Sequence, residues 1–452
     1  MTLGRAYWRL LVLLLLVGLV GAACASPQGE TPTGETAAEG EAPAEEAAQA
    51  GEVVFFSTQL APIEEAEKVR NAILPDFTGQ VEFIGAENYA AWADRVTAEA
   101  EAGEGSIDLL GGLHGDFVSA GTDLLTDVSD LMGELSDRGF SEQYTELATL
   151  GTDSTFYVPW MQGTYIMAAN QKALEHLPEG ADVEALTYEQ YLEWAGNIAE
   201  ATGQNKVGFP AGEGGLMHRF FQGYLIPSFT GGLVTTFTES EPAWQWLSDI
   251  WQYTHPQSVS YEFMQEPLLS EEVWVAWDHV ARLIDALEAR PDDFVAFPAP
   301  TGPEGQAFMP VLAGLAIPNT APNPEGAAEL IRYLTEPETQ FTTLREVAFF
   351  PVVDAELPAD LSPGVSAEAE AVQQQTEAPE ALPSLLPIGL GELSGDFNKV
   401  FTDSFQQIIL QEAEIASVLE QQAQALESVM QETGAPCWEP DPPSEGEPCP
   451  VQ

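Results

Sequence analysis

Two short stretches combine aromatic rings with polar side chains in a way that suits a polyhydroxylated ligand. The first runs from Tyr157 to Asn170. Its Trp160 and Tyr165 offer flat apolar faces, and Gln162 can both donate and accept hydrogen bonds. The second is Trp277-Asp278-His279, where a ring stands next to a carboxylate. A sugar needs both kinds of group, because its C–H face stacks on a ring while its hydroxyls need donors and acceptors.

The stretch from Tyr157 also has a purely structural interpretation, a buried strand with two core aromatic residues. The residues alone leave the two interpretations level. The position of the stretch decides between them, because it follows one doubly wound half and precedes another, so the chain passes the interface here. We therefore expect Trp160 and Gln162 to face a ligand cleft. Ile166 and Met167 should lie in the core of the second half.

The second stretch belongs to an element expected from Val273 to Leu287. On a helix, Trp274, Trp277 and Asp278 share one face, and Arg282 one turn later can orient the carboxylate. The alternative is that both tryptophans are core residues and that Asp278 pairs with Arg282 on the surface. Mixed aromatic and polar side chains are typical of binding sites, so we favour the binding interpretation.

The sequence lacks the common local motifs of catalysis and metal binding. It has no phosphate-binding loop ending in Gly-Lys-Ser/Thr, no His-Glu-x-x-His, no Gly-x-Ser-x-Gly and no Cys-x-x-Cys. Its histidines, at positions 114, 176, 218, 255 and 279, are too far apart for a local metal motif. With so many acidic residues, a pair of carboxylates says almost nothing about glycoside hydrolysis. We therefore favour a binding protein without a cofactor over an enzyme.

Length and charge narrow the classes of partner. The 452 residues exceed one ordinary core and predict two domains or one two-lobed unit. The chain carries 14 Lys and Arg against 72 Asp and Glu, a formal net charge of −58. A field of this sign repels phosphates and no basic patch offsets it, so we expect no nucleic-acid partner. A saline habitat is our hypothesis for the acidity, since salt screens self-repulsion.

The two ends of the chain predict export and an anchor. Residues 1–23 are expected to be a lipoprotein signal peptide, because an apolar run from Leu10 to Val20 ends in small residues before Cys24. Cleavage before Cys24 leaves this cysteine to carry a lipid, whereas cleavage after Ala25 releases a soluble protein. We favour the lipid anchor, since a cysteine here has no other evident use. The protein is then extracytoplasmic and held at the cell membrane.

The segments that flank the folded part differ in composition from it. Residues 24–51 are mostly Pro, Gly, Thr, Ala and Glu, which predicts an acidic, disordered tether. Residues 434–452 form a Pro-rich acidic tail that contains Cys437 and Cys449. Outside the cytoplasm these two cysteines are expected to form a disulfide, the alternative being two unpaired thiols.

Strands and helices alternate in the first part of the folded chain. Apolar runs predict three strands, at residues 53–56, 81–84 and 107–110. Helical periodicity between them predicts a parallel, doubly wound α/β sheet, in which ligands gather at the carboxyl ends of strands. Gln59 follows the first strand and His114 follows the third, so we place both in the ligand site. Farther along, one long helix is expected from about Ser404 to Met430, and residues 213–237 resist assignment.

The order of these features resembles the extracellular solute-binding proteins of ABC importers, family 1, of the sugar-binding lipoprotein type. The resemblance covers residues 52 to about 433. Besides the signal and the tether, it rests on short motifs, which are Tyr157-Val-Pro-Trp160, Trp277-Asp278, Ala299-Pro-Thr-Gly-Pro-Glu-Gly305, Gly314-Leu-Ala-Ile-Pro318, Glu325-Gly-Ala-Ala328 and Pro337-Glu-Thr-Gln340.

The resemblance implies a type II periplasmic-binding-protein fold, with two doubly wound α/β lobes that are joined by three crossings and close on a ligand. It maps the first lobe to residues 52–157 and 296–336, and the second to residues 158–295 and 337–433. It also implies a sugar or oligosaccharide ligand and ABC permease subunits as partners, and we expect a monomer. The expected ligand-binding residues are Trp160, Gln162, Tyr165, Trp277, Asp278, His114 and Gln59.

Three other functions remain open from the sequence. The same scaffold can serve a polyamine or another cationic solute, which the excess of carboxylates favours. A secreted glycan-active enzyme is the second alternative. An adhesion or sensory protein that uses the same fold is the third.

Overall fold

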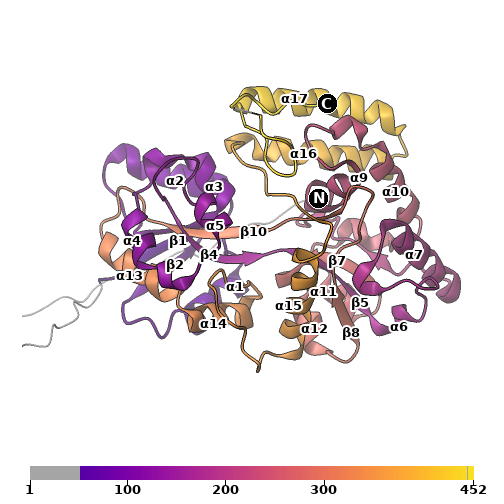
Figure 1. Ribbon diagram of the computed structural model, residues 1–452, viewed down its shortest axis with the longest axis horizontal. Helices are drawn as coiled ribbons and strands as arrows, with labels where there is room; N and C mark the ends of the chain where they lie inside the picture. Colours follow the sequence, from indigo (N-terminus) through magenta and orange to yellow (C-terminus); the bar gives the residue numbers. More distant parts are fainter. Residues whose placement is uncertain (1–50, 445) are drawn as a thin grey trace, which may run out of the picture. The chain divides into compact units, whose positions relative to one another are not determined.

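The computed structural model describes residues 51–444 and 446–452, and these belong to one compact unit. The expected signal peptide, Cys24 and nearly all of the tether lie outside the described residues. Two groups of elements make up two lobes, each built around its own sheet (Figure 1). Within the described residues, no helix combines the length and the apolar character that crossing a membrane requires.

The first lobe is built on a five-stranded sheet in the order β2-β1-β3-β10-β4. β1 pairs in parallel with both β2 and β3, as the alternation of strands and helices predicts, whereas β10 pairs antiparallel with β3 and β4. The strands are β1 (Val53–Ser57), β2 (Val81–Gly85), β3 (Leu109–Leu113), β4 (Val158–Gly163) and β10 (Val311–Ala316).

The helices of the first lobe connect and cover this sheet. They include α1 (Ile63–Lys68), continued by the π-helix η1 (Val69–Ile73), and α2 (Tyr89–Ala102), α3 (His114–Ala120), α4 (Ser129–Glu134), α5 (Glu142–Leu147), α13 (Pro324–Leu334) and α14 (Pro337–Val347). The start of α2 is specified locally, because the Asn88 side chain accepts a hydrogen bond of 2.9 Å from the Ala91 amide. The helix ends at Gly103, whose φ of +67° suits glycine.

The second lobe is built on a four-stranded sheet in the order β6-β7-β5-β8, with a separate pair formed by β9 and β11. The strands are β5 (Tyr165–Asn170), β6 (Val207–Gly208), β7 (Val275–His279), β8 (Phe294–Phe297), β9 (Gln306–Phe308) and β11 (Ala381–Pro383). The helices are α6 (Gln171–Leu174), α7 (Tyr188–Thr202), α8 (Met217–Phe220), α9 (Ile226–Thr230), α10 (Glu241–Trp251), α11 (Gln265–Leu269), α12 (Ile284–Ala289), α15 (Pro363–Thr376), α16 (Ser394–Phe405) and α17 (Ile415–Thr433).

The strands are apolar on both sides because each sheet is covered on both faces. In β1, Phe55 packs into one core cluster of the first lobe and its neighbour Phe56 packs into another. Neighbouring residues of a strand point to opposite faces, so a continuous apolar run is what a sheet between two layers needs. In β5, Ile166 and Met167 likewise enter two different clusters of the second lobe, which confirms their expected place in its core.

Two expectations about helices are wrong. Trp277 and Asp278 lie in the strand β7, because this segment pairs with β5 in the middle of the second sheet. The single helix expected from Ser404 to Met430 is broken, since α16 runs through a π-helical turn, η10 (Gln406–Leu410), into the non-helical residues Gln411–Glu414. Glu412 has a φ of +55° there, which a continuous helix does not allow.

The chain passes between the lobes at positions that differ from the expected boundaries. β4 pairs with β10 in the first sheet, so the first crossing comes after Gly163 rather than after Tyr157. β8 pairs with β5 in the second sheet, so the second crossing comes after β9, at Met309 and Pro310. α14 contacts α1 and η1 of the first lobe, so the third crossing comes after α14 rather than after residue 336.

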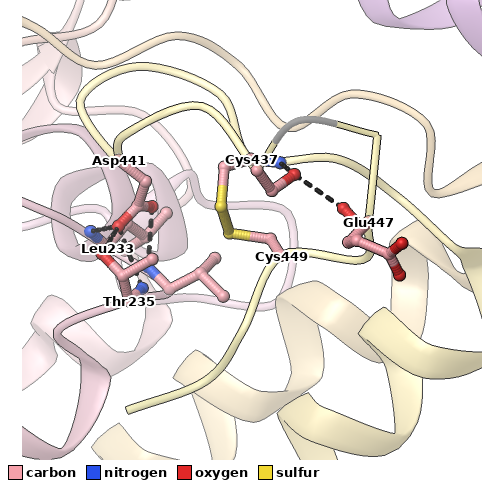
Figure 2. The surroundings of a disulfide bond; sticks show 8 residues. Leu233, Thr235, Cys437, Asp441, Glu447 and Cys449 are labelled. Atoms are coloured by element: carbon pink, nitrogen blue, oxygen red, sulfur yellow. Dashed lines mark hydrogen bonds between the residues drawn. A yellow bond between two sulfur atoms is a disulfide. The ribbon is translucent and has the colours of Figure 1, made fainter.

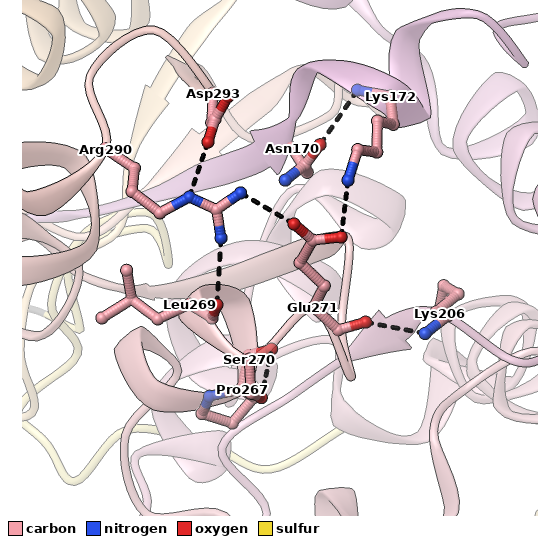
Figure 3. A network of polar contacts seen from close by, with 9 residues as sticks. All are labelled: Asn170, Lys172, Lys206, Pro267, Leu269, Ser270, Glu271, Arg290 and Asp293. Atoms are coloured by element: carbon pink, nitrogen blue, oxygen red, sulfur yellow. Dashed lines mark hydrogen bonds and ion pairs between the residues drawn. The ribbon is translucent and has the colours of Figure 1, made fainter.

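A polar network fastens the ends of several strands of the second sheet (Figure 3). The carboxylate of Glu271 lies 2.6 Å from Nζ of Lys172, just after β5, and 2.7 Å from Nη2 of Arg290, just before β8. The carbonyl of the same residue accepts a hydrogen bond of 2.7 Å from Lys206, just before β6. Both cations lower the pKa of the Glu271 carboxyl. One residue therefore links three strand ends.

The tail is attached to the second lobe and contains a disulfide between Cys437 and Cys449, with an S–S distance of 1.99 Å. Cys449 is buried at the edge of a core cluster of the second lobe, whereas Glu447 in the same loop is exposed.

Glu368 on α15 makes stability depend on pH. Its side chain is fully buried, and neither carboxylate oxygen has a hydrogen-bond partner among the described residues. Burial, together with the charges of Glu288 and Asp285 on α12, raises its pKa well above the usual range. Above about pH 4 the unfolded chain releases this proton while the folded chain keeps it, so folding becomes less favourable as the pH rises toward the raised pKa.

We expect Glu368→Gln to remove this loss, so that its melting temperature exceeds that of the wild type by a margin that grows with pH above about 5. In free energy of unfolding, the wild type loses about 1.4 kcal/mol per pH unit relative to the variant until the pH reaches the raised pKa. Glu370→Gln, an exposed change on the same helix, is the matched control. A constant margin between pH 5 and pH 8, measured by thermal unfolding, would contradict the buried acid.

The net charge of −58 makes a second prediction about stability. We expect the melting temperature to rise with NaCl up to about 1 M, because the screening length falls from about 10 Å at 0.1 M to about 3 Å. A series in sucrose controls for preferential exclusion of the solute. A flat response to NaCl would count against charge repulsion as a limit on stability and against the saline habitat.

Candidate functional site

Several polar side chains come together at one edge of the first sheet, where β1 and β3 have their carboxyl ends. Oγ1 of Thr58 donates a hydrogen bond of 2.7 Å to Oδ2 of Asp116, and the Leu113 amide donates one of 2.8 Å to the same oxygen. Nε2 of Gln59 donates to Oγ1 of Thr58 at 3.1 Å. Gln59 and His114 were placed at this edge from the sequence, and the parallel pairing of β1 with β3 explains why they share it.

His114 is the first residue of α3, and its ring lies against a buried tyrosine. Its Nδ1 is 3.0 Å from the hydroxyl of Tyr157. Burial lowers the pKa of His114 to about 4. The ring is therefore neutral at neutral pH and offers one nitrogen that donates and one that accepts.

Asp116 was not singled out in the sequence, although it lies only two residues after His114. It is partly buried, and burial raises its pKa, whereas the hydrogen bonds from Thr58 and Leu113 and the charge of Arg219 lower it. Arg219 belongs to the second lobe, so these two opposite charges act on each other across the boundary between the lobes.

Two arginines of the second lobe face this boundary. Arg219 on α8 donates a hydrogen bond of 2.9 Å to Oε1 of Gln222. Arg282 follows β7, donates to the carbonyls of Glu262 and Gly214 at 3.1 and 3.3 Å, and lies 4.4 Å from the ring centre of Phe263.

Burial lowers the pKa of Arg219, and the charge of Asp116 raises it. Arg282 in turn lowers the pKa of Glu65 on α1, which burial raises. Each arginine thus has a carboxylate of the first lobe as its electrostatic counterpart. Neither pair comes within ion-pair distance in the described part of the chain. A guanidinium has five N–H donors, and Arg219 uses one on Gln222, so it can donate to the hydroxyls of a ligand.

Trp160 and Gln162 do not occupy the ligand-facing positions expected for them. Trp160 is fully buried in the core of the first lobe, where its ring centre lies 5.4 Å from that of Phe55. The amide of Gln162 has protein partners on both sides, because Nε2 donates to the Pro351 carbonyl at 2.9 Å and Oε1 accepts from the Tyr144 hydroxyl. Both residues hold β4 in place.

Tyr165 and Trp277 form a stack inside the second lobe. Their ring centres are 4.8 Å apart and the planes differ by 5°, and Trp277 is fully buried. The indole N–H of Trp277 has no partner among the described residues, so the ring is a packing element. Burial raises the pKa of Tyr165 to about 12, and the charges of Arg219 and Arg282 lower it.

Asp278 is a structural carboxylate. It is fully buried and accepts hydrogen bonds from the amides of Met264 at 3.0 Å and His279 at 2.8 Å. Burial raises its pKa to about 7, although Arg282 and the two amides lower it. Asp278 and Trp277 are neighbours on a strand and point to opposite faces, so they cannot form the joint platform that a helix would make.

The first crossing is closely packed. A Cβ on Gly163 would lie 2.8 Å from Nε2 of His279 and 3.2 Å from the Phe349 ring, so only glycine fits. Oγ1 of the next residue, Thr164, donates to the carbonyl of Met309 at 2.9 Å, which joins the first crossing to the second.

The comparison with protein families agrees with this architecture. The model of the bacterial extracellular solute-binding protein family matches residues 66–341. The chain belongs to this family. A search of curated proteins found no match to this solute-binding protein.

Solved structures share the fold over 84% of this solute-binding protein. Maltose-bound MalE3 of T. maritima has a TM-score of 0.67, 17% identity and 100% of its own chain covered. The bacterial solute receptor AcbH has a TM-score of 0.66, 14% identity and 99% covered. UgpB of Mycobacterium tuberculosis, in complex with glycerophosphocholine, has a TM-score of 0.62, 18% identity and 99% covered. These similarities establish the two-lobed type II periplasmic-binding-protein fold.

Two features of the sequence point to Arg219 and Asp116, which the sequence analysis did not predict as site residues. The first feature is Arg219, which ends the run Gly-Leu-Met-His-Arg at 215–219 and precedes two phenylalanines. An arginine in such a place is unusual in a chain with only 14 basic residues in 452. Asp116 lies in the same Gly-rich strand end as His114. Tryptophan is the weaker signal, because it is as often a core residue as a ligand platform.

The placement of Trp277 makes a testable prediction about stability. We expect Trp277→Ala to lower the free energy of unfolding by about 3–5 kcal/mol, because it empties a buried site of a large ring. Trp277→Phe, which fills part of the volume, should lose less. Chemical denaturation measures both. A Trp277→Ala variant of unchanged stability that loses only ligand affinity would return this ring to the ligand site.

Proposed function

We propose that this chain is a receptor, anchored by a lipid on Cys24, that binds a sugar or oligosaccharide between its lobes and delivers it to the permease of an ABC transporter. Membership of the solute-binding family supports the class of function. The observation that carries the choice of site is the polar edge at the carboxyl ends of β1 and β3, where Thr58 and the Leu113 amide both donate hydrogen bonds to Asp116.

The chemistry of this site suits a neutral, hydroxylated ligand. The first lobe supplies an acceptor in Asp116 and mixed donors and acceptors in Gln59 and His114. The second lobe supplies donors in Arg219 and Arg282. A hydroxyl both donates and accepts, so it can bridge a carboxylate on one lobe and a guanidinium on the other. Such a ligand favours the closed arrangement because it binds both lobes only there.

A polyamine or another cationic solute is the first alternative. The carboxylates Glu65 and Asp116 favour such a ligand, but each has an arginine of the second lobe as its counterpart, which repels a second cation. A secreted glycan-active enzyme is the second alternative. Asp278 is buried beneath the protein surface and bonded to two amides, so it does not support hydrolysis at that residue.

The proposed mechanism needs lobes that move as bodies. We propose that the first lobe comprises residues 52–163 and 310 to about 354, and the second the remainder to 433, with closure of a monomer about the three crossings. No covalent chemistry is involved, and lobe closure is the functional step.

A thermal-shift screen of the purified protein tests the ligand class. We expect neutral mono- and oligosaccharides to raise the melting temperature and polyamines and amino acids to leave it unchanged, because only a ligand of the native state stabilises it. A shift by spermidine with none by any sugar would contradict the proposal. Hydrolysis of a stabilising glycan during the assay would favour the enzyme instead.

For the stabilising sugar, we expect Arg219→Ala to weaken binding about 10–100-fold, since it removes hydrogen bonds from a charged donor. Arg219→Lys should lose less, because it keeps the charge without the planar fork. Arg345→Ala is the control, since Arg345 is exposed and pairs with Asp360. Isothermal titration gives the dissociation constants. Equal affinities for the wild type and Arg219→Ala, both folded, would remove Arg219 from the site.

A further inference from the structure

The tail that follows α17 is fastened to the second lobe by a buried carboxylate (Figure 2). Asp441 is 3% exposed. It accepts hydrogen bonds from the amides of Leu233 at 3.1 Å, Val234 at 2.9 Å and Thr235 at 2.9 Å, and from the Thr235 hydroxyl at 2.5 Å. Charge-assisted bonds to consecutive amides fix both partners, so this attachment is specific. The disulfide between Cys437 and Cys449 closes the loop that carries Asp441.

The same tail supports a second segment, residues 384–391, which follows β11. The Leu385 amide donates a hydrogen bond of 2.9 Å to the carbonyl of Glu439. A Cβ on Gly389 would lie 3.4 Å from Cβ of Ala435, so the two backbones are in contact. Leu386 and Leu390 belong to the same core cluster as Trp438 and Cys449. Residues 384–390 lie in neither a helix nor a strand, so they have few internal hydrogen bonds and are held by these contacts with the tail.

Residues 384–391 also touch the first lobe at α3, the helix that carries Asp116. The Gly391 amide donates a hydrogen bond of 3.4 Å to Oγ of Ser119. A Cβ on Gly115 would lie 2.9 Å from the carbonyl oxygen of Pro387. The segment therefore contacts the first lobe on one side and the tail on the other.

The other end of the segment is tied to the cleft arginine. Oγ of Ser384 donates to the carbonyl of Gln222 at 3.0 Å, and the side chain of Gln222 accepts from Arg219. Nε2 of Gln222 donates in turn to Asn398 on α16 at 2.9 Å. The position of residues 384–391 thus affects both the contact with α3 and the support of Arg219.

We propose that the disulfide-closed tail is a brace that holds residues 384–391 against α3, and so sets how readily the lobes close. Closure as the functional step rests on the function proposed above. The disulfide limits the conformations of the tail loop, and Asp441 anchors that loop to the second lobe. The loop therefore supports residues 384–391 on the side opposite α3. Without the brace, the segment gains freedom and the contact with α3 becomes intermittent, which favours the open arrangement.

Hydrogen exchange of the ligand-free protein tests the brace with two variants that break it differently. The double change Cys437→Ser and Cys449→Ser removes the cross-link. Asp441→Asn keeps the cross-link but places an amide N–H₂ against the backbone amides of residues 233–235. Glu447→Gln is the matched control, because it removes one charge from the same loop at an exposed position. Exchange in α7 and α13 reports whether each variant is folded.

We expect amides in residues 384–391 to exchange about tenfold faster or more in both brace variants, and those in α3 to exchange faster as well, with α7, α13 and the Glu447→Gln protein unchanged. Faster exchange confined to the tail and residues 231–238 would overturn the proposal, because the tail would then stabilise only its own surroundings. Faster exchange in residues 384–391 without a change in α3 would also overturn it.

This experiment needs no ligand, so its outcome is independent of the thermal-shift screen. If the variants show no change in exchange but a sugar binds in the thermal-shift screen, the brace is excluded and the proposed function stands. A brace effect without any sugar that binds would remove the proposed ligand and leave the mechanical coupling.

Discussion

The passage of the backbone at Gly163 and Thr164 is the constraint on which the two-lobed structure depends. The side chain of His279 and the ring of Phe349 fill the space that a Cβ at Gly163 would need. The Thr164 hydroxyl bonds to the carbonyl of Met309, so the chain leaves and re-enters the first lobe at one point. The third crossing is held to the same strand, because the amide and carbonyl of Gln162 both pair with Phe350. The three crossings therefore lie close together in a small, well-packed region.

The site follows from this arrangement and from the charge of the protein. Parallel strands of the first lobe end at one edge, which places Thr58, Gln59, His114 and Asp116 side by side. In the second lobe, the charge of Arg219 acts on Asp116 at that edge, and the charge of Arg282 acts on Glu65 of α1. On a chain with 72 acidic and 14 basic residues, half-buried arginines that form no ion pair with another described residue are costly to retain for packing alone. We propose that they donate hydrogen bonds to a ligand where the two lobes meet.

Much of the fold could be predicted from the sequence, because short-range patterns mark the strands and helices of the first sheet. Its apolar runs are short and are separated by helical periodicity, and Gln59 and His114 do follow β1 and β3, whereas their place in a ligand site stays a prediction. The family resemblance extended the prediction to both lobes. The prediction of a helix around Trp277 is wrong because the apolar spacing there fits a helix and a central strand equally well. Only the pairing of this segment with β5 decides that it is a strand. Aromatic residues in such a strand are buried by the second layer of helices.

The charged part of the site could not be predicted in the same way. Asp116 and Arg219 are about a hundred residues apart in sequence and belong to different lobes, so their opposition arises only from the tertiary structure. Asp441 of the tail lies about two hundred residues from its partners, which are backbone amides that no sequence pattern marks. The edge with Gln59 and His114 follows from local sequence patterns, whereas the place of Asp116 and Arg219 depends on the tertiary structure.

The most direct test of the account is a crystal structure of the protein with the sugar that stabilises it most. The account predicts the sugar between the lobes, with hydroxyls bonded to Asp116 on one side and Arg219 on the other. Sugar bound elsewhere, or bound in the cleft with both of these side chains turned away from it, would contradict the account.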